Sequence, residues 1–142
     1  MATIERSAVA AGRSAADIEV VLPAFVVTGA DEDEMAAVAE AVRQQVAFYG
    51  STPAYRGVLD HHGWGDAHSE LNAMSKRGEW EAMADVIDDD LLVEFAVVAE
   101  LDDIAAKILE RYAGIVDRLS LYPMPGTSAG TWDKVIDDLT AG

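Results

Sequence analysis

Residues 17–50 read DIEVVLPAFVVTGADEDEMAAVAEAVRQQVAFYG, and they hold two patterns that set the fold class. Residues 17–29 are mostly β-branched and apolar between polar ends, which is typical of a strand covered on both faces of a parallel sheet. Pro23 is discordant, because proline cannot donate to a sheet ladder, so it favours an edge strand or a bulge there. Residues 31–50 begin with four acids and continue with apolar residues three or four positions apart. They predict an amphipathic helix that Gly50 would end.

The rest of the chain continues the alternation of helices and strands. Two more strands are predicted in EFAVVA (94–99) and IVDRLSLYPM (115–124). Helices are predicted at about residues 3–11, 53–63, 67–77, 80–88, 100–113 and 131–142. This order predicts one α/β domain over 1–142 with parallel strands and a helical insertion at about 51–90. The first and third strands are expected to be the outer ones.

Composition limits the possible partners. The chain has 142 residues, with 26 acidic against 10 basic residues and a formal charge of -16. Such a surface repels phosphate backbones and anionic lipids, so neither nucleic acid nor membrane is expected as a partner. Cys is absent, which excludes disulfides, thiolate metal sites and cysteine nucleophiles. Without an apolar signal segment at the N-terminus, the protein is expected to be soluble and cytoplasmic.

The stretch RQQVAFYGSTPAYRGVLDHHGWGD (43–66) raises the question of a metal site or a catalytic loop. His61, His62 and His68 are not three or four positions apart, so a shared metal ion is not expected, and surface or helix-end histidines are. The acids at 31–34 and 88–90 lack the spacing of a calcium loop. GTSAG (126–130) matches neither a phosphate-binding loop nor a nucleophile elbow.

Several segments resemble a known family. AGRSAADIEVVLPAFVVTGADEDEM (11–35) is similar to the sixth strand and its flanks in luciferase-like monooxygenases. VAFYGSTPAYRGVLDHHGWGD (46–66), LNAMSKRGEWEAM (71–83), FAVVAELDDIAAKI (95–108) and VDRLSLYPM (116–124) resemble a subgroup of F420-dependent oxidoreductases in the same order. The resemblance implies the C-terminal part, about three βα units, of a TIM-type (β/α)8 barrel, which needs on the order of 250 residues. It also implies coenzyme F420, with FMN as the alternative.

The resemblance indicates where a site would lie. Barrel enzymes carry their chemistry at the carboxyl ends of the strands. We therefore assign cofactor binding to Thr28, Gly29, Tyr122 and Met124, and we assign no catalytic residue and no metal ligand. Two alternatives stay open, since Thr28 would equally cap the next helix and both Tyr122 and Met124 would equally be packing residues. After the middle strand, relatives often carry Gly-Thr-Pro where this chain has Ala99, Glu100 and Leu101.

Two main functional hypotheses follow, beside a third, in which the chain is a free-standing binding module that uses the insertion helices. In the first, the intact protein is an oxidoreductase that transfers hydride between F420 (or FMN) and a small organic substrate. In the second, this chain is a catalytically incompetent half-barrel that self-associates, or that pairs with a missing N-terminal barrel half, because its apolar strands leave open edges. Residues 43–66 connect a helix to a strand, so they are expected on the barrel face opposite the active site.

Overall fold

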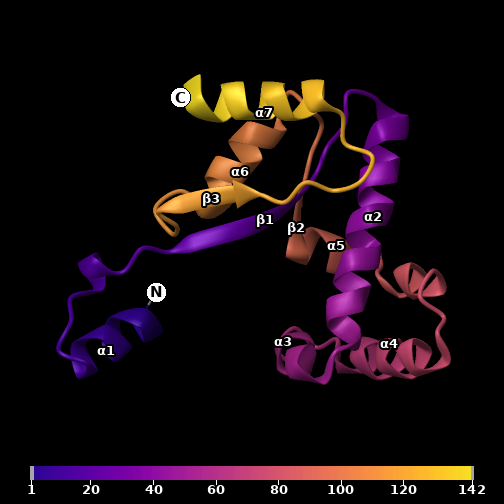
Figure 1. The fold of residues 1–142 in the computed structure, drawn as a ribbon, viewed down its shortest axis with the longest axis horizontal. Coiled ribbons are helices and arrows are strands. Elements are labelled where there is room, and N and C mark those ends of the chain that lie inside the picture. The colour runs from indigo at the N-terminus through magenta and orange to yellow at the C-terminus, as the bar shows by residue number, and fades with distance from the viewer. Residues whose placement is uncertain (1, 142) are drawn as a thin grey trace.

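The computed structural model describes residues 2–141 and has an α/β fold (Figure 1). Its three strands are β1 (Val21–Val27), β2 (Ala96–Val98) and β3 (Arg118–Leu121), and all pairings are parallel. The helices are α1 (Ala2–Ala10), α2 (Glu32–Ser51), α3 (Arg56–His61), α4 (Gly65–Arg77), α5 (Asp89–Phe95), α6 (Ile104–Tyr112) and α7 (Ala129–Ala141). Short 3₁₀ helices are η1 (Ala15–Asp17), η2 (Pro53–Tyr55) and η3 (Ala82–Val86). The predicted α/β class and parallel sheet are confirmed.

The strand order is β2-β1-β3, so β1 is the central strand. The expectation that the first strand lies at an edge is therefore wrong, while that for the third is confirmed. The two pairings of β1 are offset along the strand: β3 pairs with residues 21–24, and β2 pairs with residues 25–27. At Pro23 only β3 is a neighbour, through Ser120, so the proline lies where the strand is locally an edge.

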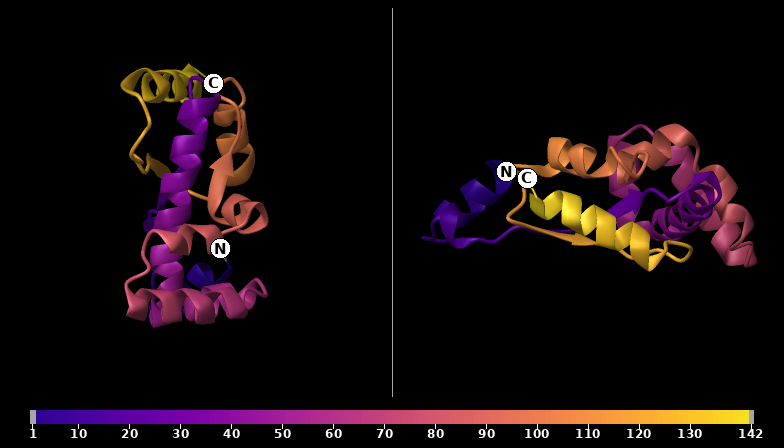
Figure 2. Two further views of the ribbon diagram at one scale, coloured as in Figure 1. Left: turned by 90° about the vertical axis from the view of Figure 1, so that its right-hand side faces the viewer. Right: turned by 90° about the horizontal axis from the view of Figure 1, so that it is seen from above.

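The carboxyl half of β1 and strand β2 are packed on both faces, whereas the residues of β3 are exposed or half-buried. Successive side chains of a strand point to opposite faces. Val27 joins a core cluster with residues of α2, α4 and α5, whereas Val26 and Val97 join a second cluster with residues of α6 and α7. Figures 1 and 2 show α2 standing across the long axis of the molecule, with α7 near its amino end and α3 and α4 at its other end. Both faces of this small sheet thus owe their burial to helices.

Helix α2 has the predicted start and a different end. The Asp31 side chain caps it by accepting from the backbone N–H of Glu34 at 2.8 Å, and Val38, Val42 and Val46 are buried. Gly50 does not end the helix, which continues to Ser51. A Cβ at Gly50 would lie 2.9 Å from Cδ1 of Leu71. The glycine therefore serves the close approach of α2 to α4, not a helix stop.

The helical insertion is present, with one correction. Helices α3 and α4 and the turn η3 lie within the predicted 51–90 segment. Residues 94 and 95, however, belong to helix α5 and not to a strand. The Asp88 side chain caps α5 by accepting from the N–H of Leu91 at 2.8 Å. At its other end, Arg111 of α6 donates to the carbonyls of Val93 and Glu94. Contacts at both ends thus hold a helix of seven residues.

Candidate functional site

The carboxyl ends of the three parallel strands lie on the same side of the sheet, which we call the carboxyl edge, but they do not all end at the same height. Val27 pairs with Val98, and the Ala99 N–H donates to the Val27 carbonyl at 3.2 Å, so β1 and β2 end together. Strand β3 ends earlier, since the N–H of Tyr122 donates to the carbonyl of Ala24 at 3.0 Å. The predicted residues at the ends of β1 and β3 are therefore staggered along the sheet.

Thr28 is buried directly after β1. It is 1% exposed, and its Oγ1 has no hydrogen-bond partner. The alternative interpretation, that Thr28 caps the next helix, does not hold, because Asp31 caps α2. Within residues 2–141, the only other buried side-chain polar atom without a partner is Oγ1 of Thr127, which precedes α7. A buried hydroxyl without a partner has unused hydrogen-bonding capacity, and such groups call for an explanation.

Gly29 is enclosed by its own chain. A Cβ built on it would lie 2.4 Å from the backbone nitrogen of Met35 and 2.9 Å from the carbonyl oxygen of Asp31. Both neighbours are backbone atoms of the tight turn from β1 into α2. Packing of this turn accounts for the glycine, and its role in cofactor binding stays a prediction.

Tyr122 and Met124 differ in their exposure. Tyr122 is 36% exposed, and its ring meets that of Phe25 edge-on at 5.1 Å between centroids. Charge repulsion from Tyr122 is the largest cause that raises the pKa of Tyr49 above its ordinary value. Met124 is 6% exposed and packs in the core cluster of α2. Tyr122 is thus accessible to a ligand, whereas Met124 is chiefly a packing residue.

Glu34 is the residue that the sequence reasoning missed. Its carboxylate accepts hydrogen bonds from the backbone N–H of Ala30 at 2.8 Å, from that of Ser128 at 2.5 Å and from the hydroxyl of Thr131 at 2.9 Å. The backbone bonds from Ser128 and then Ala30 lower the pKa of Glu34 to about 2. The ionised carboxylate therefore joins the turn after β1 to the loop after β3.

The carboxyl edge is acidic. Around the ends of β1 and β2 the sequence places seven acids, namely Asp31, Glu32, Asp33, Glu34, Glu100, Asp102 and Asp103. A helix N-terminus ordinarily attracts an anion, and at α7 the carboxylate of Glu34 already takes that place. Lys134 of α7 pairs with Asp102 at 3.3 Å and with Asp138 at 2.8 Å. The carboxyl edge of this chain therefore disfavours binding of a phosphate group.

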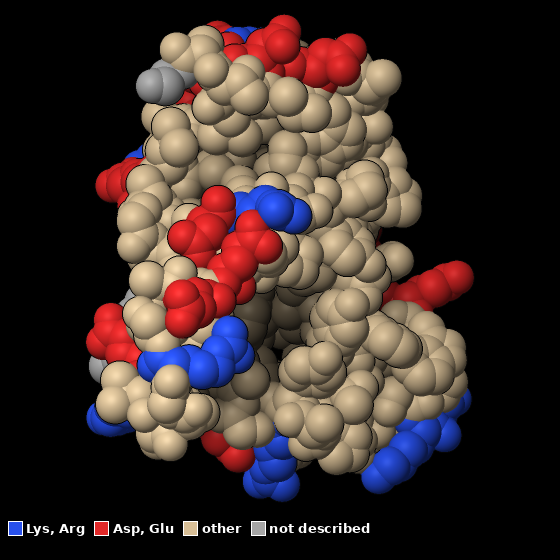
Figure 3. All heavy atoms as spheres, turned by 60° about the vertical axis from the view of Figure 1, so that its left-hand side comes forward, with Lys and Arg blue, Asp and Glu red and all other residues tan. Residues whose placement is uncertain are grey.

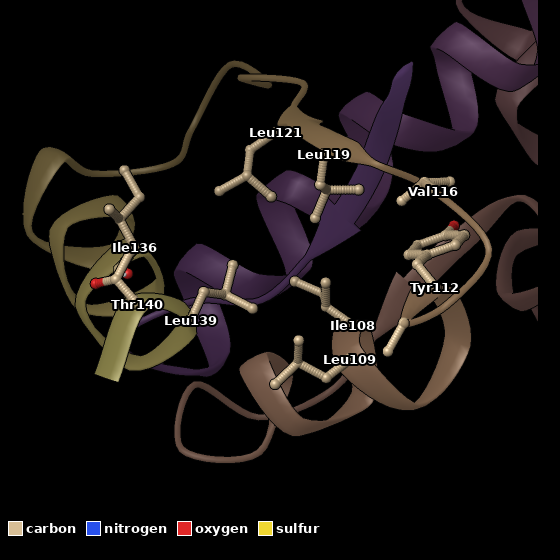
Figure 4. A pocket seen from close by; sticks show the side chains of 10 residues that line it. Ile108, Leu109, Tyr112, Val116, Leu119, Leu121, Ile136, Leu139 and Thr140 are labelled. Carbon is tan, nitrogen blue, oxygen red and sulfur yellow. The ribbon is translucent and has the colours of Figure 1, made fainter. Parts of the chain in front are cut away.

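A large apolar groove lies apart from the carboxyl edge. A groove of about 560 Å³ runs between α6, β3 and α7 (Figure 4). Its lining is Ile108, Leu109, Tyr112, Ala113, Val116, Leu119, Leu121, Ile136, Leu139 and Thr140. None of the four predicted cofactor-binding residues lines it. The groove is consequently a feature separate from the carboxyl edge.

The histidines and Arg118 have structural partners. His68 is buried, contrary to the expected surface position, and its Nδ1 lies 2.6 Å from the carbonyl oxygen of Gly50. It ties α4 to the last turn of α2. The ring of His62 stacks on that of Trp64 with centroids 5.5 Å apart. Arg118 pairs with Glu19 at 2.8 Å.

Comparison with known proteins defines the class. The profile of the luciferase-like monooxygenase family matches residues 1–118, and the chain belongs to this family. An uncharacterized protein of Mycobacterium tuberculosis and one of Mycobacterium bovis are each 55% identical to it over 108 residues. That alignment covers 76% of this chain and 32% of each relative, so the chain spans about a third of their length.

A solved structure has the same fold. The coenzyme F420-dependent tetrahydromethanopterin reductase of Methanopyrus kandleri matches with a TM-score of 0.67 and 22% identity. The match covers 94% of this chain and 38% of the reductase. The chain therefore has the α/β fold of a portion of that barrel enzyme, as predicted. No helix within residues 2–141 is long and apolar enough to cross a membrane, and a cytoplasmic location stays a prediction.

Proposed function

We propose that this chain forms part of the cofactor site of an oxidoreductase that transfers hydride between F420 and an organic substrate, with FMN as the alternative cofactor. Membership of the luciferase-like family and the fold of an F420-dependent reductase support the proposal. The observation that carries it is the buried Oγ1 of Thr28, which lacks a partner at the carboxyl end of the central strand. In barrel enzymes this end carries the chemistry.

The residues of this chain fit only part of such a cofactor. The hydroxyl of Thr28 and the ring of Tyr122 suit the uncharged, aromatic portion of a flavin or deazaflavin. The acidic edge around Glu34 does not suit the phosphate of either cofactor. Cationic groups for the phosphate would have to come from the other two thirds of the fold found in the relatives. The bound cofactor would supply the hydride chemistry, and these residues would orient its ring.

A full-length chimera tests this function. In it, the matched segment of the M. tuberculosis relative is replaced by the corresponding residues of this chain. We expect quenching of F420 or FMN fluorescence with a dissociation constant in the micromolar range, similar to that of the unmodified relative. A folded chimera that binds neither cofactor would refute the proposal.

Two observations favour a second function. The chain matches only part of the length of its relatives, and its acidic carboxyl edge does not suit the phosphate of a cofactor. Taken alone, this chain is proposed to be catalytically incompetent and to act only after association, either with itself or with the N-terminal part of a barrel. Strands β2 and β3 each have one strand neighbour within residues 2–141, which leaves their outer edges free to pair. Fluorescence titration of F420 and FMN into the isolated chain checks this, and micromolar binding by a monomer would exclude it.

A further inference from the structure

We infer that Thr127 is a second ligand-binding residue of the candidate cofactor site, and that Glu34 is the positioning residue that sets its hydroxyl and that of Thr28 for one ligand. The inference rests on the proposed function and deepens it, because it names two further residues of this chain on which that site depends. The part of the ligand that the two hydroxyls contact is an uncharged polar group, such as a carbonyl or an amide.

Two buried hydroxyls of this chain have unused hydrogen-bonding capacity. Within residues 2–141, Oγ1 of Thr28 and Oγ1 of Thr127 are the only buried side-chain polar atoms without a partner. Thr28 directly follows β1, and Thr127 lies in the loop between β3 and α7. Both therefore follow the carboxyl end of a strand, although they lie far apart in the sequence. A buried hydroxyl is costly to leave unpaired, so a ligand that bonds to both would recover free energy.

Glu34 joins the two segments that carry these hydroxyls. Its carboxylate accepts from the backbone N–H of Ala30 at 2.8 Å, two residues after Thr28. The same carboxylate accepts from the backbone N–H of Ser128 at 2.5 Å, and Ser128 directly follows Thr127. One side chain therefore fixes the turn after β1 against the loop before α7, and with it the relative placement of the two hydroxyls.

The loop before α7 is also packed against α2. Gly126 has a φ of +100°, and a Cβ built on it would lie 3.4 Å from the Cβ of Ala37. Met124 of the same loop is 6% exposed and belongs to the core cluster of α2. These contacts on the N-terminal side of Thr127, and the bond to Glu34 on its other side, order the loop before a ligand arrives. Binding there would cost little conformational entropy.

The chemistry of the carboxyl edge selects an uncharged ligand group. A threonine hydroxyl both donates and accepts hydrogen bonds, so it suits a carbonyl and an amide equally. Figure 3 shows acidic side chains gathered at the end of the molecule where Figure 1 places α7 and the start of α2, and this charge repels an anion. A buried cation would lack a free counterion, since three donors already occupy the carboxylate of Glu34.

Cofactor titrations of a full-length chimera test the role of Thr127. The chimera carries the whole of this chain in place of the matched segment of the M. tuberculosis relative, and quenching of F420 or FMN fluorescence gives the dissociation constant. Thr127→Val should weaken binding about tenfold, because one hydrogen bond to the ligand is lost. Thr140→Val is the control and should change the affinity less than about twofold, since that exposed hydroxyl bonds to carbonyls of its own helix.

A double-mutant cycle tests the role of Glu34. Glu34→Gln should weaken binding about fivefold when both threonine hydroxyls are present, and less than about twofold in the chimera that carries Thr28→Val and Thr127→Val. A positioning residue acts only through the groups that it positions, whereas a general loss of structure would weaken binding equally in both backgrounds. Glu32→Gln, in the same first turn of α2, is the control and should leave the affinity unchanged in both.

Three results would overturn the inference. The first is an unchanged affinity of the folded Thr127→Val chimera, and the second is an effect of Glu34→Gln that is equally large in both backgrounds. If Thr28→Val still weakens binding, either result refutes this inference and leaves the proposed function intact. The third is a folded chimera that binds neither cofactor, which refutes both. Circular dichroism verifies that each variant is folded.

Discussion

Glu34 and Thr131, which lie 97 positions apart in the sequence, are joined by a hydrogen bond of 2.9 Å from the threonine hydroxyl to the glutamate carboxylate. The same carboxylate accepts from the backbone N–H groups of Ala30 and Ser128. It thereby fixes the turn after β1 against the start of α7. Because Thr28 lies two residues before Ala30 in that turn, the position of the candidate cofactor contact depends on this junction.

Replacing Glu34 by Gln should lower the free energy of unfolding by about 1–2 kcal/mol at pH 7, because hydrogen bonds to an ionised group are lost. The pKa of Glu34 falls from 4.5 to about 2 on folding, so its stabilisation is complete above the unfolded pKa and is lost as the pH falls through the folded one. Urea unfolding of both proteins should show the difference shrinking from about pH 5 to about pH 2.

The control for this variant is Glu32→Gln in the same first turn of α2. An exposed acid at a helix start contributes only about 0.3–1 kcal/mol. If Glu32→Gln destabilised the protein as much as Glu34→Gln, the general helix dipole and not the junction with α7 would explain the effect.

Gly29→Ala should cost about 3 kcal/mol, because the new Cβ meets backbone atoms of Met35 and Asp31 that cannot turn aside. Gly130→Ala in α7 has no heavy atom within 4 Å of its new Cβ and should instead gain about 0.5–1 kcal/mol. Thermal unfolding of both variants measures the contrast. A neutral Gly29→Ala would mean that the turn is looser than described.

Arg111→Gln should destabilise the protein by about 2 kcal/mol, because the carbonyls of Val93 and Ala96 lose a charged donor. Arg111→Lys should recover part of this, since a compact ammonium cannot bond as a planar fork. Relative to the unmodified chain, Arg111→Gln should accelerate amide hydrogen exchange most in the last turn of α5. Arg56→Gln, which removes an exposed pair with Asp60, is the control and should change stability by less than about 0.5 kcal/mol.

The sequence predicted those elements whose signals are local. Strand β1 and helix α2 follow from the spacing of apolar residues and from the acids around Asp31. Helix α5 was missed because one of its ends is held by Arg111, at a distance of 18 and 17 residues from the carbonyls it contacts. Gly50 was misread for a similar reason, since Leu71 of another helix determines its role. The order of the strands in the sheet could not be predicted, because the spacing of apolar residues within one strand does not say which strands lie beside it.

The candidate site was predictable only in part. The rule that chemistry lies at strand ends selected Thr28, and the structure finds a buried hydroxyl without a partner there. Glu34 looked like one of four helix-start acids, because its partners Ser128 and Thr131 come from the far end of the chain. Met124 was selected by the same rule and turned out to be mainly a core residue.

Cofactor affinity of the full-length chimera with and without Thr28→Val tests the central claim most directly. Valine keeps the shape of threonine and removes the hydroxyl, so the fold should be retained while the proposed contact is lost. The account predicts saturable binding of F420 or FMN that the substitution weakens about tenfold, equivalent to about 1.4 kcal/mol. Equal affinity of the two chimeras, or binding of neither cofactor by a folded chimera, would contradict it.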